Sequence, residues 1–324
     1  LEAASPMSEV RTGFDGLAIS VATRAMEQKL QQQDISALLI AGPTASGKSA
    51  LALKLARELG GEIVNADSMQ VYGVLDRLTA RPDAADLAEI PHHLYGHVPP
   101  TEIYSTGIWL EQATRVISDI RARGAIPVVV GGTGLYFRAL TGGLSDMPPI
   151  PDDIRNELRA RLETEGVEAL HAELNELDPA MAERLRPADR QRILRALEVV
   201  RTTGQSIAGF QGRGSAMIVD PLSARCLVLE PERPVLHARI NGRFAGMMEE
   251  GAVDEVRELL KLDIPPQHPA MKAIGVRQIA DYLAGRLSRE QAIELASTAT
   301  RQYAKRQMTW FRNQLGEEWQ RIQP

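Results

Sequence analysis

Residues 37–49 read ALLIAGPTASGKS, an apolar run that passes directly into a glycine-rich turn. The run from Ala37 to Ala41 contains no polar side chain, which is typical of a parallel strand buried on both faces. The turn matches G-x-x-x-x-G-K-[ST], the pattern of a phosphate-binding loop (P-loop), and leucines at four-residue spacing follow it, as in a helix. A buried strand, a P-loop and a helix in this order predict an α/β protein with a parallel sheet.

Each residue type in this loop suits the binding of a phosphate group. Glycines let backbone N–H groups close around phosphate oxygens, and the helix N-terminus adds a favourable partial charge. Lys48 would neutralise the outer phosphate, and the Ser49 hydroxyl would hold Mg²⁺. We therefore expect a diphosphate, or a nucleotide such as ATP, to bind Gly42, Pro43, Thr44, Ala45, Ser46, Gly47, Lys48 and Ser49. The pattern does not distinguish these ligands, because the loop contacts only phosphate.

Three further segments read as strands of the same sheet: Glu62–Ala66, Ile126–Val130 and Cys226–Glu230. Helical patterns alternate with them, and so we expect a P-loop NTPase-like parallel sheet flanked by helices. The strand Ile126–Val130 ends in Gly131, where a motor ATPase has a carboxylate that holds Mg²⁺ beside the attacking water. This difference argues against a motor ATPase.

The middle of the chain reads as an all-helical insertion domain at residues 144–216. It contains helical patterns such as Ile154–Glu163 and Arg190–Thr202 and no convincing strand. The expected P-loop-like core, with its C-terminal helices, then comprises residues 35–143 and 217–324. Residues 1–34 form an N-terminal extension whose polar composition is compatible with disorder.

The composition excludes several classes of protein. The chain has 324 residues, 44% of them apolar and 24% charged, as in a soluble globular protein of about two domains. We expect no membrane span, because no apolar run approaches the roughly 20 residues that a span requires, and we see no secretory signal. The single cysteine, Cys226, excludes an internal disulfide and fits a reducing cytoplasm. The net charge of −5 excludes a uniformly basic protein but allows one basic face.

Polar side chains follow the second and third strands, where they would face the same crevice as the P-loop. The Asp67 carboxylate could be a general base toward a nucleophile or an outer ligand of Mg²⁺, although on its own an Asp here is more often the cap of the next helix. The segment Gly131-Gly132-Thr133-Gly134 suits equally a phosphate contact through Thr133 and a tight strand-to-helix turn. For His92-His93, which has no second cluster of ligands, we expect a turn or a core pair rather than a metal site.

Two helical segments are rich in arginine. Between Arg184 and Arg201 six arginines stand against two acids, and the apolar stripe leaves Gln191, Arg192 and Arg195 together on the other side. Near the C-terminus, basic and aromatic residues gather at Arg301, Lys305, Arg306, Trp310, Phe311 and Arg312. Either run alone is usually a solvated face. Together, beside a phosphate site, they favour a polyanion such as RNA, with an unstacked base lying on aromatic rings.

Taken together, these motifs resemble those of the bacterial tRNA dimethylallyltransferases, also called isopentenyl-diphosphate:tRNA isopentenyltransferases. The resemblance covers residues 36–319 and rests on GPTASGKS at 42–49, ADSMQVY at 66–72, TARP at 79–82, PHHL at 91–94, YSTGIW at 104–109, PVVVGGTGLYFRAL at 127–140, DRQRILRALEV at 189–199, LHARINGRF at 236–244, KAIGVRQI at 272–279 and ATRQYAKRQMTWFR at 299–312. It implies transfer of a dimethylallyl group from dimethylallyl diphosphate to N6 of adenine 37, immediately 3′ of the anticodon, in tRNAs that read codons starting with U. Diphosphate is the second product.

The resemblance also implies roles for individual residues. The P-loop, through Lys48 and Ser49, would hold the donor diphosphate with Mg²⁺, and Asp67 would be the general base on the N6 amine. Thr133 and Arg243 would contact the donor diphosphate. Contacts with the anticodon stem-loop are implied for Asp67, Ser68, Met69, Gln70, Gln191, Arg192, Arg195, Lys272, Gly275 and Arg277. We expect a cytoplasmic monomer.

Three other functions compete with this interpretation. A small-molecule or nucleoside kinase also has a P-loop and an Asp after the second strand. A nucleotide-gated RNA-binding protein would bind RNA without modifying it. A cytokinin-type isopentenyltransferase would act on free adenine nucleotides, but a mononucleotide would not need the long insertion and two arginine-rich helices.

Overall fold

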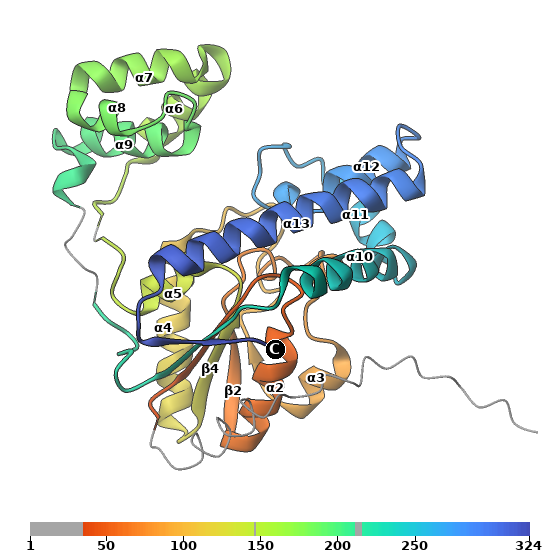
Figure 1. Ribbon diagram of the computed structural model, residues 1–324. Helices are drawn as coiled ribbons and strands as arrows, with labels where there is room; N and C mark the ends of the chain where they lie inside the picture. The colour runs from red at the N-terminus through yellow and green to blue at the C-terminus, as the bar shows by residue number, and fades with distance from the viewer. Residues whose placement is uncertain (1–34, 146, 211–215) are drawn as a thin grey trace, which may run out of the picture. The chain divides into compact units, whose positions relative to one another are not determined.

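The computed structural model describes residues 35–145, 147–210 and 216–324 (Figure 1). They form two compact units. The core unit consists of the described residues up to Phe137 together with Pro221–Pro324, and the inserted unit is Arg138–Asp220. The sequence placed the insertion at residues 144–216, so the compact unit extends beyond both expected boundaries. The expectation for residues 1–34 lies outside the described residues.

The core unit contains a six-stranded sheet with the strand order β3-β2-β4-β1-β5-β6. Its strands are β1 (Leu38–Ala41), β2 (Gly61–Asn65), β3 (His92–His93), β4 (Ile126–Gly131), β5 (Arg225–Leu229) and β6 (Trp319–Ile322). All neighbouring strands are parallel, which confirms the predicted α/β class and parallel sheet. The two edge strands were not predicted. His92-His93 forms one of them, instead of the turn or core pair that we expected.

Helices flank this sheet. In the core unit they are α2 (Lys48–Leu59), α3 (Ala84–Glu89), α4 (Thr106–Ala122), α10 (Arg233–Glu249), α11 (Ala252–Leu260), the 3₁₀ turn η2 (Ala270–Lys272), α12 (Val276–Leu283) and α13 (Arg289–Gln314), and α5 (Gly134–Leu140) leads into the inserted unit. The helix after the P-loop ends as predicted, because Gly60 adopts a left-handed conformation (φ 63°) in which its N–H bonds to the Ala56 carbonyl. No helix in the described part of the chain is long and apolar enough to span a membrane.

The period of two along each strand divides the core between the two faces of the sheet. Leu38, Ile40 and Val128 belong to a buried cluster that also contains Leu55 of α2. Helix α4 lies on the other side of the sheet (Figure 1). It carries Trp109, which is completely buried. Its indole stacks on Tyr136 of α5 with ring centroids 4.0 Å apart, and its Nε1–H donates to the Asn65 carbonyl at 2.8 Å. This face of the sheet is thereby fixed at the point where β2 ends.

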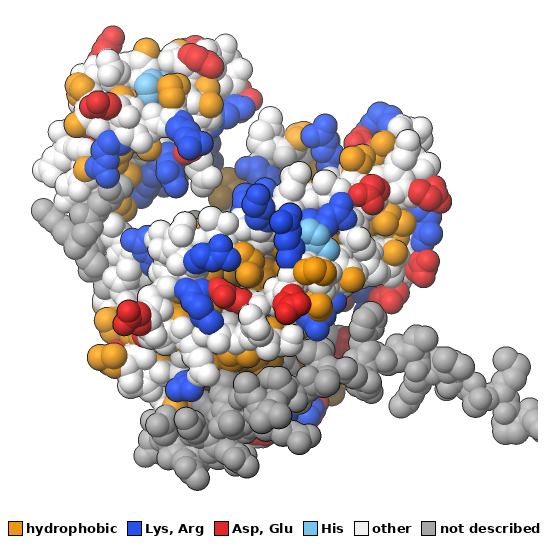
Figure 2. Space-filling view, in the orientation of Figure 1, with side chains coloured by type: hydrophobic (Ala, Val, Ile, Leu, Met, Phe, Trp, Pro, Cys, Tyr) orange, Lys and Arg blue, Asp and Glu red, His pale blue; other side chains and the backbone are white. Residues whose placement is uncertain are grey.

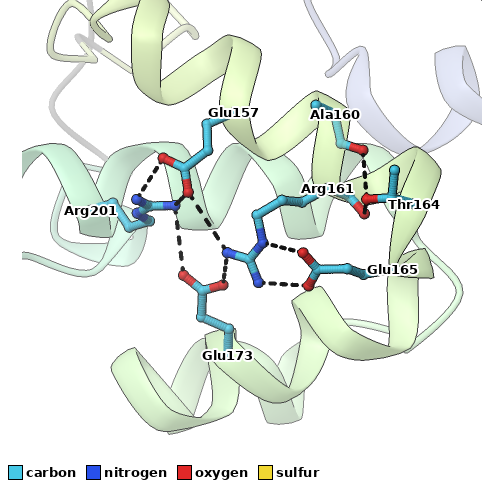
Figure 3. A network of polar contacts seen from close by, with 7 residues as sticks. All are labelled: Glu157, Ala160, Arg161, Thr164, Glu165, Glu173 and Arg201. Atoms are coloured by element: carbon cyan, nitrogen blue, oxygen red, sulfur yellow. Dashed lines mark hydrogen bonds and ion pairs between the residues drawn. The ribbon is translucent and has the colours of Figure 1, made fainter.

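The inserted unit is helical, as predicted. It consists of α6 (Asp152–Thr164), α7 (Gly166–Leu177), α8 (Pro179–Arg184), α9 (Arg190–Thr203) and the 3₁₀ turn η1 (Ile207–Gly209), packed around an apolar core of their own. Ion pairs join its helices (Figure 3). Arg161 binds Glu165 and Glu173, and Arg201 binds both oxygens of Glu157 at 2.9 Å. These two arginines therefore hold the helices of this unit together.

Candidate active site

The P-loop connects β1 to α2 at the carboxyl edge of the sheet. Its backbone is left-handed at Ala45 (φ 62°) and Gly47 (φ 88°), and the Ser46 N–H bonds to the Pro43 carbonyl at 3.2 Å. Left-handed residues in a turn aim successive backbone N–H groups into one concavity, which is the geometry that binds anions. The loop predicted from the sequence is therefore present with the backbone conformation that phosphate binding requires.

Lys48 lies at the start of α2, and its Nζ donates to the Pro43 carbonyl at 3.3 Å. Burial lowers the pKa of Lys48 to about 8, the nearby Asp67 carboxylate opposes this shift, and the positive charge of Arg243 adds to it. Burial also lowers the pKa of Arg243, against the attraction of Asp67. Two cations and one carboxylate, all half-buried, thus share a pocket that carries an excess of positive charge. An anion in this pocket would restore the pKa of Lys48 by favouring its charged form.

Asp67 directly follows β2 and is held by Asn65 and by its own turn. The Asn65 Oδ1 accepts from the Asp67 N–H at 2.8 Å, and the Asp67 Oδ1 accepts from the Met69 N–H at 3.0 Å. The structural alternative, a cap for the next helix, is wrong: that helix begins only at Ala84 and is capped by Asp83. The second carboxylate oxygen, Oδ2, has no donor among the described residues and is available to a substrate.

Three phenols lie close enough to the Asp67 carboxylate to be affected by its charge. Burial raises the pKa of Tyr95, Tyr136 and Tyr303, and the negative charge of Asp67 adds to each shift. These phenols therefore keep their protons at neutral pH. Of the three, Tyr136 is fully buried, whereas Tyr95 and Tyr303 are half-buried.

Thr133 joins the loop after β4 to the loop after β2. Its hydroxyl accepts from the Ser68 N–H at 2.9 Å and donates to the Ser68 Oγ at 3.3 Å, while its own N–H donates to the Ala66 carbonyl at 3.0 Å. The glycines around it are needed for packing: a Cβ at Gly131 would lie 2.1 Å from the Ala66 backbone. The tight turn is thus present, and the long bond to Ser68 leaves the Thr133 hydroxyl able to turn toward a phosphate.

The residues expected to bind magnesium fit a metal that is held mainly by its substrate. Ser49 is exposed at the N-terminus of α2, and the described residues contain no cluster of three or more His, Cys, Asp or Glu that could hold a metal alone. Mg²⁺ in phosphate-transfer sites usually takes one or two protein oxygens, with phosphate oxygens and water completing its octahedron. The Ser49 hydroxyl beside a bound diphosphate suits this pattern.

Several residues predicted to contact RNA in the core unit have structural partners. The Gln70 side chain donates to the carbonyls of Thr79 and Ala80, and Met69 packs half-buried among apolar side chains. Gly275 is buried with φ 105°, and a Cβ there would lie 2.5 Å from Leu78. The exposed members of the predicted set are Lys272 and Arg277. These two cations, rather than Gly275, can reach a ligand on the surface.

In the inserted unit, the predicted RNA residues lie on one helix, α9. Gln191 and Arg192 are exposed, with the Arg192 guanidinium 3.5 Å from Asp189, and Arg195 is partly exposed and bonded to Glu198 at 3.2 Å. The Arg192–Asp189 pair lies on the exposed surface, where ion pairs are weak, whereas Glu198, the partner of Arg195, is buried. A phosphate can therefore replace Asp189 as the partner of Arg192, and it can bind the exposed part of the Arg195 side chain in addition to Glu198.

The basic C-terminal helix α13 borders a groove of about 510 Å³. Lys305, Arg306 and Trp310 line this α13 groove. Figure 2 shows Lys and Arg side chains gathered on this face. The expectation that Phe311 offers a ring to a base is wrong, because Phe311 is fully buried. Neighbouring positions on a helix point about 100° apart, so Trp310 and Phe311 cannot both face the groove.

Two residues of the site were missed by the sequence analysis. Arg239 of α10 donates to the Ser46 carbonyl of the P-loop at 3.4 Å. Gln307 of α13 is 6% exposed and binds both the P-loop and the loop after β4. One signal was available for Gln307: it falls on the helix stripe that also contains the buried residues Ala304 and Phe311, and a polar residue in an apolar stripe needs partners.

The parallel sheet, the P-loop and the neighbouring Lys48, Arg243 and Asp67 define an α/β protein of the P-loop class. Sequence comparison agrees: the model of the family described as IPP transferase matches residues 70–314, and that described as isopentenyl transferase matches residues 35–95. The chain belongs to the IPP transferase family.

Individual relatives cover almost the whole chain. The tRNA dimethylallyltransferase of Agrobacterium fabrum is 61% identical over 292 residues, which are 90% of this chain and 98% of that protein. The tRNA dimethylallyltransferase of Rhizobium meliloti is 59% identical over 291 residues, 90% of this chain and 96% of that one.

Two solved structures have the same fold. The tRNA isopentenylpyrophosphate transferase of Bacillus halodurans superimposes with a TM-score of 0.62 at 37% identity, covering 89% of this chain and 90% of that chain. A eukaryotic dimethylallyltransferase acting on tRNA superimposes with a TM-score of 0.71 at 30% identity, covering 85% of this chain and 69% of that one.

Proposed function

We propose that the protein transfers a dimethylallyl group from dimethylallyl diphosphate to N6 of adenine 37 in tRNAs that read codons starting with U. The observation that carries this proposal is the shared pocket of Lys48, Arg243 and Asp67, in which two cations suit a diphosphate and one carboxylate suits an amine. Membership of the IPP transferase family and the names of the relatives support it.

The reaction that fits this pocket is a direct displacement. The adenine N6 forms a bond to C1 of the dimethylallyl group while the C1–O bond breaks, and the bonding electrons leave with the diphosphate. The N6 proton passes to Asp67 Oδ2, which has no donor within the described residues. A positioned general base contributes about 10²- to 10⁴-fold to such a step.

The P-loop side of the pocket stabilises the departing diphosphate. Backbone N–H groups of the loop, Lys48 and Arg243 place positive charge where negative charge develops. Ser49 and the diphosphate would hold Mg²⁺, which, when bound, neutralises part of the charge of the leaving group. The Thr133 hydroxyl would turn from Ser68 to a phosphate oxygen.

The RNA is proposed to bind exposed cations on both units. On the core unit these are Lys272, Arg277 and the side chains of the α13 groove, where Trp310 offers a ring to an unstacked base. On the inserted unit they are Arg192 and Arg195 of α9. The adenine must leave its stack to reach the half-buried Asp67 carboxylate, as in other enzymes that modify bases. We propose that the enzyme acts as a monomer in the cytoplasm.

The test supplies purified protein with Mg²⁺, dimethylallyl diphosphate and an anticodon stem-loop RNA. Mass spectrometry of the digested RNA should find dimethylallyladenosine at the position 3′ of the anticodon, and free diphosphate should appear in equal amount. Parallel reactions with ATP and with free AMP test the kinase and the cytokinin-type alternatives. Phosphoryl transfer from ATP, or prenylation of AMP with unmodified RNA, would reject the proposal.

A further inference from the structure

Gln307 connects the two loops that face the candidate diphosphate site. It projects from α13, and its side-chain carboxamide is almost fully buried. Its Oε1 accepts from the Thr44 N–H of the P-loop at 3.0 Å, and its Nε2 donates to the Gly132 carbonyl at 2.9 Å. One side chain thus fixes the backbone of both loops, which lie 263 and 175 residues away in the sequence.

The two bonds require the amide of a glutamine. The Thr44 N–H needs an acceptor and the Gly132 carbonyl needs a donor, and a carboxamide supplies one of each. A glutamate offers only acceptors, and a methionine of similar length offers neither. Since the bond to the Gly132 carbonyl is buried and that from the Thr44 N–H is part-buried, loss of Gln307 leaves backbone groups unsatisfied at a substantial cost.

Gln307 is also adjacent to the reacting carboxylate. A Cβ at Gly132 would lie 2.3 Å from the Gln307 Nε2 and 3.2 Å from the Asp67 Oδ2, so this glycine separates the two side chains. The next residue, Thr133, bonds to the Ser68 N–H beside Asp67. Any shift of the loop after β4 therefore moves the segment that contains Asp67.

The P-loop has further contacts with the same helices. Ala45 packs on Leu236, Ile240 and Ala304, which belong to α10 and α13. Ala45 holds a left-handed conformation that is unfavourable for alanine, so its surroundings must impose it. Three consecutive loop residues, Thr44 to Ser46, are thus held by α10 and α13.

We infer that Gln307 is a positioning residue for the donor: its carboxamide sets the P-loop and the loop after β4 at the spacing that binds one diphosphate beside Asp67. This inference rests on the proposed function for the identity of the donor. It assigns Gln307 to the donor site and not to RNA binding, although its neighbours Lys305 and Arg306 face the α13 groove.

The test compares Gln307→Met and Gln307→Glu with the parent enzyme and with Ser297→Ala. The methionine variant loses both hydrogen bonds, and the glutamate variant keeps only the bond from Thr44. Ser297 is a matched control, because it is a buried polar residue of the same helix, 1% exposed, whose hydroxyl has no partner among the described residues. Calorimetry measures the Kd of magnesium diphosphate, and steady-state kinetics measure KM for dimethylallyl diphosphate and kcat.

We expect both Gln307 variants to raise the Kd of magnesium diphosphate and the KM for the donor about tenfold or more. The Kd for the stem-loop RNA and the melting temperature of the control should stay at their parent values. The hydrogen-exchange rate of the Thr44 amide should rise in Gln307→Met, and it should stay low in Gln307→Glu.

A folded Gln307→Met protein with the parent Kd for magnesium diphosphate overturns the inference. If that variant does not fold, the same result for Gln307→Glu overturns it. Diphosphate binding is measured without RNA or prenyl donor, so a parent enzyme that fails to prenylate RNA would reject the proposed function and leave this measurement valid.

Discussion

Asp67 combines a fixed backbone with one unoccupied carboxylate oxygen. Asn65 and Met69 hold the residue in place through Oδ1 and the main chain, so the side chain needs no reorganisation before it accepts a proton. A preorganised base costs little at the moment of reaction. The chemistry proposed here therefore depends on the charge of Asp67 more than on its bulk.

Asp67→Asn should lower kcat about 10²- to 10⁴-fold, because the amide keeps the size and the Met69 bond but cannot accept a proton. The Kd of the stem-loop RNA should change less than about threefold, since the RNA is held mainly by cations elsewhere. Single-turnover kinetics and filter binding measure the two quantities. If the variant keeps the parent kcat but binds RNA much more weakly, Asp67 is not the general base.

Lys48 should make donor binding depend on pH. Its pKa is lowered to about 8 in the free protein, so it is charged below that pH and loses its proton as the pH rises through about 8. A bound diphosphate favours the charged form, and affinity should fall above about pH 8, by up to tenfold per pH unit. Calorimetry with a non-reactive alkyl diphosphate between about pH 7 and pH 9 measures this. Lys48→Met is the control, and it should bind the alkyl diphosphate weakly at every pH. A Kd of the parent protein that is equally independent of pH would contradict the prediction.

At the level of secondary structure, close packing between loops sets the shape of the site. Gly131 lets β4 end directly against the Ala66 backbone, and Gly134 lies against the Trp310 ring. These are contacts between segments far apart in sequence, and they allow no side chain between them. The loops after β2 and β4 consequently form one surface.

Gly131→Ala should destabilise the core unit by about 1–3 kcal/mol, because the new methyl group would lie 2.1 Å from backbone atoms of Ala66. Gly242→Ala is the matched control on α10, where a Cβ meets nothing within 4 Å. Removal of a glycine from a helix interior should stabilise the protein by about 0.5–1 kcal/mol. Urea denaturation measures both changes, and equal stability of the two variants would show that the close approach at Gly131 is unimportant.

The elements with strong local signals were predictable from the sequence. The strand, P-loop and helix from Leu38 to Leu59 follow a continuous apolar run, a glycine pattern and a helical period, and their observed bounds lie close to the predicted ones. The edge strands β3 and β6 have no such signal, since they contain two and four residues and include polar ones. Pairing with a formed sheet creates them.

The parts of the site that depend on tertiary contact were not predictable. Arg239 contacts the P-loop, which lies 193 residues away in the sequence, and no local sequence pattern predicts such a contact. The cap interpretation of Asp67 failed because it assumed a helix that begins only at Ala84. Phe311 was grouped with Trp310 by proximity in the sequence, whereas the helix turns one of them inward.

For the whole molecule, the division into two units separates two kinds of ligand contact. The core unit contains the P-loop, proposed to bind the diphosphate, and the α13 groove, whereas the inserted unit presents arginines of α9. Several ion pairs of the inserted unit join different helices of that unit, as Figure 3 shows for Arg161 and Arg201. Arg161 and Arg201, which hold the unit together, are thereby distinct from Arg192 and Arg195, which are proposed to bind RNA.

Replacing Arg192 and Arg195 together by alanine should weaken RNA binding and reduce the slope of log Kd against log salt by about 2, if each arginine contacts one phosphate. The Kd of the alkyl diphosphate should not change, because that ligand binds the core unit. The control replaces Arg57 and Arg115, two exposed arginines of α2 and α4 that also pair with acids. Filter binding across a salt series measures the slopes. An unchanged slope in the α9 variant would exclude these arginines from the RNA contact.

The three tryptophans of the chain differ in their access to solvent. Trp109 and Trp319 are 0% and 4% exposed, whereas Trp310 lines the α13 groove. A collisional quencher such as iodide will therefore reach mainly the indole of Trp310. The ultraviolet emission of the unlabelled protein consequently contains a selective optical signal from this one face, and occupancy of the groove can be followed there in real time.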